Sequence, residues 1–508
     1  MTYKTRQNWK DLVEKPDHPT ITRRDLLARG MATGFMSLGV SNALAGELIK
    51  KAMADTTGSV TCTQTKSPGC IAQIYADGGP TMGARFLSTQ QMNYINNPVS
   101  GATIATNYGV TSVTNIGANL NVDPNSPFGA VLLAGPPGYP GGSAAWKTNV
   151  LSRVSAGGHL GPFNQDDGAG EDSGLIGGVS PFLSSPLGKD IVIGNGSSIR
   201  APAAWANGLP NVQVAGTLTP NSLAKTFTMT PAPTNLVTTG SMAAASTAAT
   251  QLAQNLSTLT GTATRKAASV TNTNATCAFV NNSAMASSGY GAALFSTSGI
   301  SSVTTSSLTN EEQAQLAAFY QSAKGVAGGV ILQFSGRDYH GQSAAQIGSS
   351  DIEEARSIVM FLAACDAAGA PGSLIYLSNG QAIANGNFGA TTFNTNTADQ
   401  TTGGSITVNP PMAVGDAGGA YNAGLALFIA APGGSPPQTM MTGTVNAATG
   451  VVTPSSNVTS SAQAVAGLYL SALNWVNGSI PQSALTKMQA NGVSVSSTNT
   501  SSLMVFSS

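Results

Sequence analysis

Charged side chains are scarce in this chain. Asp, Glu, Lys and Arg make up 9% of its 508 residues, against roughly 25% in an average soluble domain. The 22 basic and 22 acidic side chains also cancel. A surface without a strong field of either sign does not attract nucleic acid, so we expect no nucleic-acid partner. Uncharged polar residues, Ala and 59 Gly take the place of charge. Such a composition is typical of proteins outside the cytoplasm, some of which self-associate.

Several recognisable signals are also missing. No apolar run reaches the roughly 18 residues that a membrane-spanning helix needs, so we expect no transmembrane span. The four cysteines include no C-x-x-C pair, which argues against a structural zinc ribbon. The G-x-S-x-G elbow, the P-loop and the dinucleotide fingerprint do not occur. No motif in the chain therefore supports the function of a serine esterase, a nucleoside-triphosphatase or a classical dehydrogenase.

The amino-terminal segment has the parts of a twin-arginine export signal. Arg23 and Arg24 precede a mildly apolar stretch over 30–40, and an A-x-A site follows at 43–45. We therefore predict a signal peptide over 1–45, recognition by the twin-arginine export machinery, and a periplasmic or extracellular mature protein. The alternative is an ordinary helix capped by Thr22.

The cysteines suggest one short disulfide loop. Cys62 and Cys70 bracket a turn-forming segment just after the predicted signal, and in an oxidising compartment this spacing suits a disulfide. Cys365 lies in an apolar helical pattern and is expected to be a core thiol. The sequence does not place Cys277.

A βαβ unit organises the chain. A short apolar run over 330–334 predicts a buried strand, a turn with Asp338 and His340 follows, and a helical pattern over 351–368 leads to another strand over 374–377. In open α/β sheets, ligands bind at the carboxyl ends of the strands, where Asp338 and His340 lie.

Further patterns complete an α/β prediction with a mostly parallel sheet flanked by helices. We expect strands over 71–76, 130–134, 191–195 and 425–430, helices over 309–324 and 460–476, a hairpin over 442–452, and a polar loop over 385–419. The apolar end of the chain is either a final strand or a segment that pairs with a neighbour. The chain divides into the signal, a first core part over 46–205, a Ser/Thr/Ala-rich insertion or lid over 206–308, and a second core part over 309–508.

Two acidic turns are ambiguous on local sequence. Asp77 and the two glycines after it form either a ligand-binding turn or a turn that needs a flexible backbone. His159, Asp166 and Asp167 belong to the densest acidic patch of the mature chain. They either contact substrate or a hard cation, or lie on a hydrated surface loop.

Taken together, these pieces resemble a family of twin-arginine-exported bacterial proteins of unknown function with an alkaline-phosphatase/sulfatase-like core. The resemblance is carried by Arg23-Arg24, by the strand that ends in Asp77-Gly78-Gly79, and by Gly336-Arg337-Asp338-Tyr339-His340-Gly341, which looks like that family's Gly-Trp-Asp-Thr-His-Gly turn. It covers most of 60–200 and 310–480. It implies an alkaline-phosphatase-like fold with a metal site at the strand ends.

The chain departs from that family at two places. Ser378-Asn379-Gly380-Gln381 stands where the family has Ser-Glu-Phe-Gly-Arg, and the segment over 416–424 lacks the family's histidine. The mature chain keeps only His159 and His340, too few for a two-zinc phosphatase site.

Two functions follow from the resemblance and its departures. The first is a non-catalytic relative with a degenerate metal site that acts in binding or surface assembly. The second is a hydrolase of the phosphatase or sulfatase type with one divalent cation, calcium or magnesium. Its predicted ligands are Asp77, Asp338 and Asn379, and His340 is its acid/base. The missing family residues, the low charge and the insertion favour the first.

Overall fold

The structure is a computed structural model of the chain. It describes residues 69–76, 78–87, 92, 109–117, 120–161, 191–194, 308–323, 329–378, 380–394, 405–416, 423–446, 452–458, 460–490, 493–496 and 499–506. The chain divides into two compact units, and these residues all belong to the unit made of Cys62–Thr238 and Val280–Ser508. The predicted signal and the predicted insertion, apart from Leu308, lie outside the described residues.

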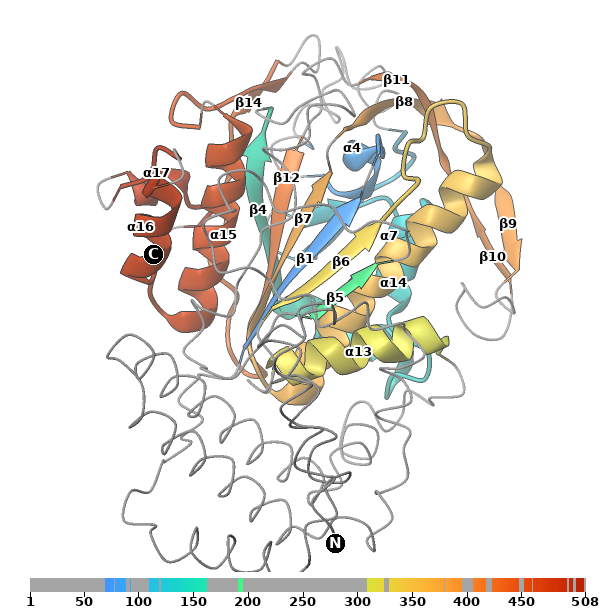
Figure 1. The fold of residues 1–508 in the computed structure, drawn as a ribbon. Coiled ribbons are helices and arrows are strands. Elements are labelled where there is room, and N and C mark those ends of the chain that lie inside the picture. Colours follow the sequence, from blue (N-terminus) through green and yellow to red (C-terminus); the bar gives the residue numbers. More distant parts are fainter. Residues whose placement is uncertain are drawn as a thin grey trace, which may run out of the picture. The chain divides into compact units, whose positions relative to one another are not determined.

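A seven-stranded sheet with the order β13-β4-β12-β7-β1-β6-β5 forms the centre of this unit (Figure 1). Its strands are β1 (Cys70–Ala76), β4 (Val154–Leu160), β5 (Ile191–Gly194), β6 (Val330–Phe334), β7 (Gly372–Ser378), β12 (Ala423–Ile429) and β13 (Met441–Thr442). Only β12 runs antiparallel to its neighbours, β4 and β7; the other pairs are parallel. The predicted mostly parallel α/β architecture is thereby confirmed.

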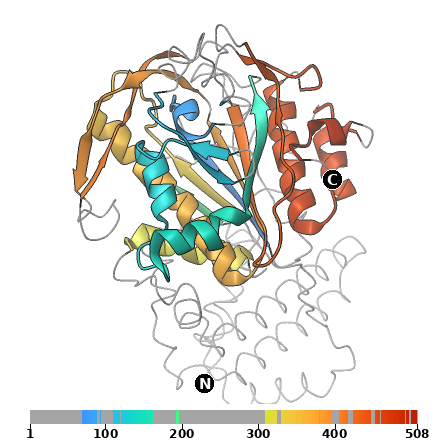
Figure 2. The same cartoon turned by 180° about the vertical axis from the view of Figure 1, so that it is seen from behind.

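Helices cover the two faces of the sheet, as the opposite views in Figures 1 and 2 show. One group comprises α7 (Pro127–Ala134), α13 (Asn310–Ala323) and α14 (Ala344–Ala368), and the other α15 (Ser461–Asn477), α16 (Gln482–Ala490) and α17 (Thr500–Leu503). Because successive side chains of a strand point to opposite faces, Ile74 of β1 joins the core of the first group and Tyr75 that of the second.

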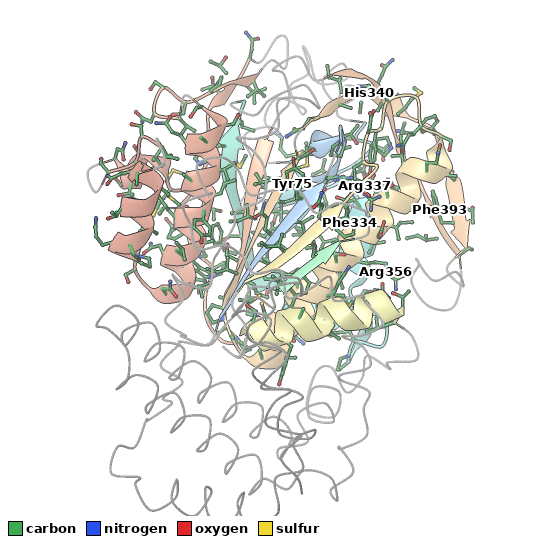
Figure 3. The ribbon with its side chains drawn as sticks, in the orientation of Figure 1. Tyr75, Phe334, Arg337, His340, Arg356 and Phe393 are labelled. Carbon is green, nitrogen blue, oxygen red and sulfur yellow. The ribbon has the colours of Figure 1, made fainter. Side chains whose placement is uncertain are left out.

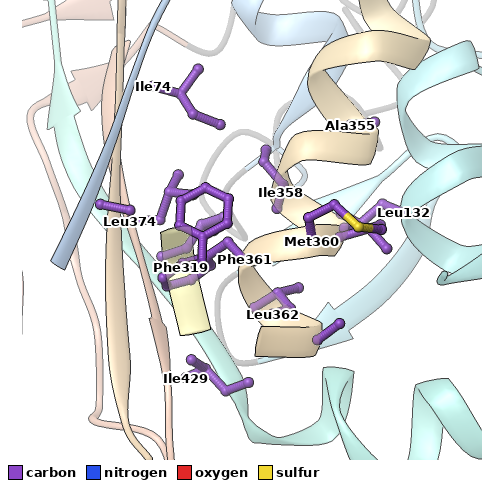
Figure 4. Packing of buried hydrophobic residues seen from close by; sticks show 14 of the residues in the cluster. Ile74, Leu132, Phe319, Ala355, Ile358, Met360, Phe361, Leu362, Leu374 and Ile429 are labelled. Atoms are coloured by element: carbon purple, nitrogen blue, oxygen red, sulfur yellow. The ribbon is translucent and has the colours of Figure 1, made fainter. Parts of the chain in front are cut away.

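The core beneath α13 and α14 is apolar and close-packed. Figure 4 shows Ile74 and Leu374 of the sheet facing the helical side chains of this cluster, including Phe361. The ring of Phe361 meets that of Phe319 edge-on, with centroids 5.6 Å apart. Such burial is the main favourable contribution to folding, and it fixes how α14 lies against the sheet.

Helix α14 begins earlier than the apolar pattern predicts, at Ala344 rather than near Asp351. Ser343 caps it: its hydroxyl accepts from the Gln346 amide, and the Gln346 side chain accepts from the Ser343 amide at 3.0 Å. This capping box is visible in the sequence and marks the true start. The helix ends at Gly369, whose left-handed backbone suits glycine.

The strand predicted over 130–134 is wrong, because these residues belong to helix α7. The Ser126 hydroxyl caps the helix by accepting from the Gly129 amide, Pro127 occupies the first turn, and Gly135 follows the last. A short apolar run does not distinguish a strand from a buried helix by its period alone. Here the capping residues on either side, Ser126 and Gly135, identify the run as a helix.

The loop predicted over 385–419 is also wrong in part. Two antiparallel pairs form there, β8 (Ala382–Asn387) with β11 (Pro411–Asp416), and β9 (Thr391–Asn394) with β10 (Ser405–Val408). The polar Thr and Asn side chains of these strands are typical of a loop, but the segment forms one hairpin, β9 with β10, inside another, β8 with β11. The predicted hairpin further on is confirmed by the pairing of β14 (Thr444–Val445) with β15 (Val452–Thr453).

Four short helices and strands complete the described part of the chain, together with one 3-10 turn. They are α4 (Met82–Arg85), β2 (Thr114–Gly117), β3 (Leu120–Val122), α8 (Gly142–Asn149) and the turn Leu151–Arg153. Within the described ranges, every helix is too short or too polar to cross a membrane.

The apolar end of the chain packs into the protein's own core. Phe506 forms a bridge with Thr439, and the Met440 amide donates to the Val505 carbonyl at 2.8 Å. The Phe506 ring stands edge-on to those of Phe428 and Trp475, at 5.2 and 6.4 Å between centroids.

Truncation of this anchor tests its contribution to stability. Phe506 is 5% exposed, so Phe506→Ala should lower the free energy of unfolding by about 3 kcal/mol, as removal of a buried ring does. Phe388, at 40% exposure, provides the matched control, and Phe388→Ala should cost less than about 1 kcal/mol. Urea unfolding measures both, and equal losses would contradict the burial of the chain end.

Candidate functional site

Three loops meet at one edge of the sheet, beyond the carboxyl ends of β1, β6 and β7. The register places Ala76 opposite both Phe334 and Ser378, so the three strands end side by side. The Tyr339 amide donates to the Gly79 carbonyl at 3.2 Å, and the Gly380 amide donates to the Gly78 carbonyl at 3.0 Å. The predicted convergence of these turns is therefore confirmed for the backbone.

Gly78 allows the closest approach between these loops. Its φ is +133°, and a Cβ at this position would lie 2.2 Å from the Asp338 backbone nitrogen. No other residue type fits there without moving the loop that carries Asp338. Gly78, the first glycine after Asp77, is thus required by packing, whatever the role of the acid itself.

Asp338 and His340 form a hydrogen-bonded pair. Asp338 Oδ1 lies 2.7 Å from His340 Nδ1 and accepts from the His340 backbone amide at 3.0 Å. The side chains are 48% and 32% exposed, respectively. The imidazole packs over Gly79, where a Cβ would stand 3.4 Å from its Cε1. Figure 3 shows His340 and Arg337 beyond the end of β6, on the side of α14. The carboxylate fixes the orientation of the ring, as acid/base and metal-binding histidines require.

The other two predicted metal ligands, Asp77 and Asn379, lie outside the described residues. Their described neighbours Gly78 and Gly380 are hydrogen-bonded to each other at this edge. Across the ranges that the structure describes, no three His, Cys, Asp or Glu side chains cluster to hold a metal. Whether a cation binds there stays a prediction.

A buried network of charges lies directly behind the Asp338–His340 loop. Arg85 of α4 is fully buried and donates to Asp351 at 2.9 Å and to the two oxygens of Glu354 at 2.7 and 3.2 Å. Arg337, on the loop itself, donates to Glu354 at 2.7 Å. The Tyr339 hydroxyl accepts from Arg85 and donates to Asp351 at 2.8 Å.

Burial and pairing oppose each other in this network. Burial raises the pKa of Asp351, and Arg85 partly offsets that shift. Burial also works to lower the pKa of Arg85, but Glu354, Tyr339 and Asp351 outweigh it and the net shift is upward. Burial raises the pKa of Tyr339 well above its ordinary value. The guanidinium groups of Arg85 and Arg337 are therefore cationic, and the carboxylates beside them already have cationic partners.

This network is not among the features predicted from the sequence. One signal was available: Asp351 and Glu354 are three residues apart on a helical pattern that is otherwise apolar, so they share one face of α14. In a chain with so little charge, two acids on a buried helix face indicate a basic partner. The identity of that partner was not available, because Arg85 lies 266 residues from Asp351 along the chain.

Of the two alternatives left open for His159, the hydrated surface loop is wrong. His159 lies in strand β4 and is fully buried beneath α15, with Nδ1 2.6 Å from the Thr442 hydroxyl. Gly467 of α15 leaves the room for the ring, since a Cβ there would lie 2.8 Å from Nε2. Asp166 and Asp167 lie outside the described residues, so their proposed contact with substrate stays a prediction.

Cys70 is the first residue of β1, and its side chain is buried in the core under α14. Its thiol is reduced in this structure, so the predicted disulfide with Cys62 is not formed. Cys62 and Cys277 lie outside the described residues. Cys365 is a buried core thiol, as predicted.

Comparison with protein-family models, with curated proteins and with solved structures finds no match to this chain. The family resemblance noted from the sequence therefore stays an interpretation of its motifs.

The burial of His159 predicts a pH dependence of stability. Burial lowers its pKa from 6.5 to about 4, although the nearby Leu503 backbone works to raise it. Between these two values the unfolded chain takes up a proton that the folded state excludes. The contribution of His159 is therefore complete above pH 6.5 and is lost as the pH falls towards 4, by about 3 kcal/mol in total.

Urea unfolding of wild type and His159→Asn between pH 4.5 and 7 measures this contribution. Asn retains a polar atom near the position of Nδ1 but has no titrating group. We expect a steeper loss of stability on acidification in the wild type than in the variant. Parallel curves would show that His159 has the same pKa in the folded and unfolded protein.

Proposed function

We propose that this chain is an exported protein with an alkaline-phosphatase-like core and a degenerate metal site, and that it acts in binding or surface assembly. Its place is the periplasm or the cell exterior, and the twin-arginine machinery is its route there. The mostly parallel sheet with a loop site at its strand ends supports the assignment of the core. The Arg23-Arg24 motif supports the route.

The proposed loss of catalysis rests on one observation. The acidic side chains near the site are already paired with arginines. Asp351 and Glu354, the fully buried carboxylates closest to the loop, bind Arg85, and Glu354 also binds Arg337. Carboxylates neutralised by guanidinium groups are poor ligands for a cation, because the cation would have to displace a buried partner. Asp338 and His340 belong to the predicted site and lie in the described part of the chain. Their side chains are hydrogen-bonded to each other.

A hydrolase of the phosphatase or sulfatase type with one metal ion is the second candidate. The specific observation in its favour is the Asp338–His340 pair itself, with Nδ1 held at 2.7 Å from the carboxylate. An imidazole held in one orientation at the carboxyl ends of the strands is suited to protonate a leaving group. In this case Asp77 and Asn379 would complete the oxygen ligands of one calcium or magnesium ion.

Metal content, hydrolysis and assembly state of the natively exported protein separate the two functions. The binding function predicts far less than one metal ion per chain by elemental mass spectrometry, in wild type and Asp338→Ala alike. It also predicts no hydrolysis of aryl phosphate or aryl sulfate above background. Sedimentation should show a mass that rises with protein concentration.

Glu353→Gln is the matched control, because it removes a carboxylate near the same loop without touching Asp338 or His340. The binding function is wrong if wild type and Glu353→Gln each hold close to one metal ion per chain, and Asp338→Ala loses both this ion and a measurable hydrolytic activity. That pattern would establish the metallohydrolase.

A further inference from the structure

Two cysteines that are distant in the sequence meet in the core. Cys70 begins β1, and Cys365 lies in the last turn of α14. Both side chains are fully buried and belong to the apolar cluster between α14 and the sheet. Their sequence surroundings predict different roles, a short disulfide loop for Cys70 and a core thiol for Cys365.

A glycine brings the two sulfur atoms together. Cys70 lies opposite Gly372 in the parallel pairing of β1 with β7, so side chains at these two positions point to the same face. A Cβ at Gly372 would lie 2.6 Å from Cys365 Sγ. The Cys365 sulfur thus occupies the space that a side chain at Gly372 would fill, directly beside the Cys70 side chain.

The surroundings of the pair are inert. Burial raises the pKa of the Cys365 thiol well above its ordinary value, and the contact with Cys70 raises it further. A thiol in this state is a poor nucleophile or metal ligand once the core has closed. A bond between the two sulfurs therefore forms while the cluster is open, either before α14 closes over it or in a transient opening of the folded protein.

We propose that Cys70 and Cys365 form a disulfide bond under oxidising conditions, so that the start of β1 is tied to the end of α14. This bond takes the place of the Cys62–Cys70 loop that the sequence predicts. It is independent of the proposed function, because it concerns the opposite end of β1 from the Asp338–His340 loop.

The chemistry is thiol–disulfide exchange with a disulfide-bearing oxidant, either a dithiol oxidoreductase or oxidised glutathione. One cysteine loses its proton and attacks the oxidant's disulfide, which gives a mixed disulfide and one thiol of the oxidant. The second cysteine then attacks the protein sulfur of the mixed disulfide and releases the other oxidant thiol. Two protein thiols are oxidised, one disulfide of the oxidant is reduced to two thiols, and the two protons are transferred to them.

Peptide mapping of the full chain tests the proposal. The protein is expressed in a host with an oxidising folding compartment, its remaining thiols are blocked with N-ethylmaleimide after denaturation, and it is digested without reductant. We expect a cross-linked peptide that contains Cys70 and Cys365, in the wild type and in Cys62→Ala alike. Cys365→Ala should lose this peptide.

Thermal unfolding gives a second measurement that does not depend on the Cys365 variant. The oxidised wild type and Cys62→Ala should each unfold several degrees higher than the same protein reduced before measurement. A cross-linked peptide joining Cys62 to Cys70 would overturn the proposal, as would N-ethylmaleimide on both Cys70 and Cys365 in the wild type.

Discussion

The buried guanidinium of Arg85 is the interaction on which the arrangement of the site depends. It lies at zero exposure, among the rings of Phe128, Tyr339 and Tyr376 with centroids 5.3 to 5.7 Å from its Cζ. An unpaired charge in such a place would be costly, so Asp351 and Glu354 must remain beside it. Those two acids come from α14, and Arg85 comes from the helix after β1. The ion pairs therefore lock the first loop of the site to the helix that follows the second.

This lock determines where Asp338 and His340 lie. Tyr339, between them in sequence, points inward to Arg85 and Asp351, so its two neighbours are turned outward to the partly exposed edge. Gly78 lets the backbone approach the same loop from the other side. The geometry of the pair is thus set by buried contacts of adjacent residues. The same contacts occupy the carboxylates that a richer metal site would use.

Local sequence predicts the elements that are defined by local patterns. The apolar runs of β1, β6, β7 and β12 gave the correct strands, and the strand ends gave the correct edge. Prediction from the sequence failed where a segment is a strand because it pairs with a neighbouring strand, although its own amino-acid composition does not favour one. Strand β4 contains Ser155, two glycines and His159, and it is a strand because it pairs with β12 along its whole length. The partners of Arg85 and of Cys365 were also beyond reach, because they are fixed only when distant segments pack together.

Amide hydrogen exchange with matched acid variants tests most directly whether buried charge holds the Asp338–His340 loop. Glu354 and Glu353 both bind Arg337, but Glu354 is 0% exposed and Glu353 is 25% exposed. Glu354→Gln should lower the free energy of unfolding by about 3 kcal/mol and speed exchange across 335–341, whereas Glu353→Gln should leave both nearly unchanged. If the two variants protect this loop equally well, the buried network does not position the site.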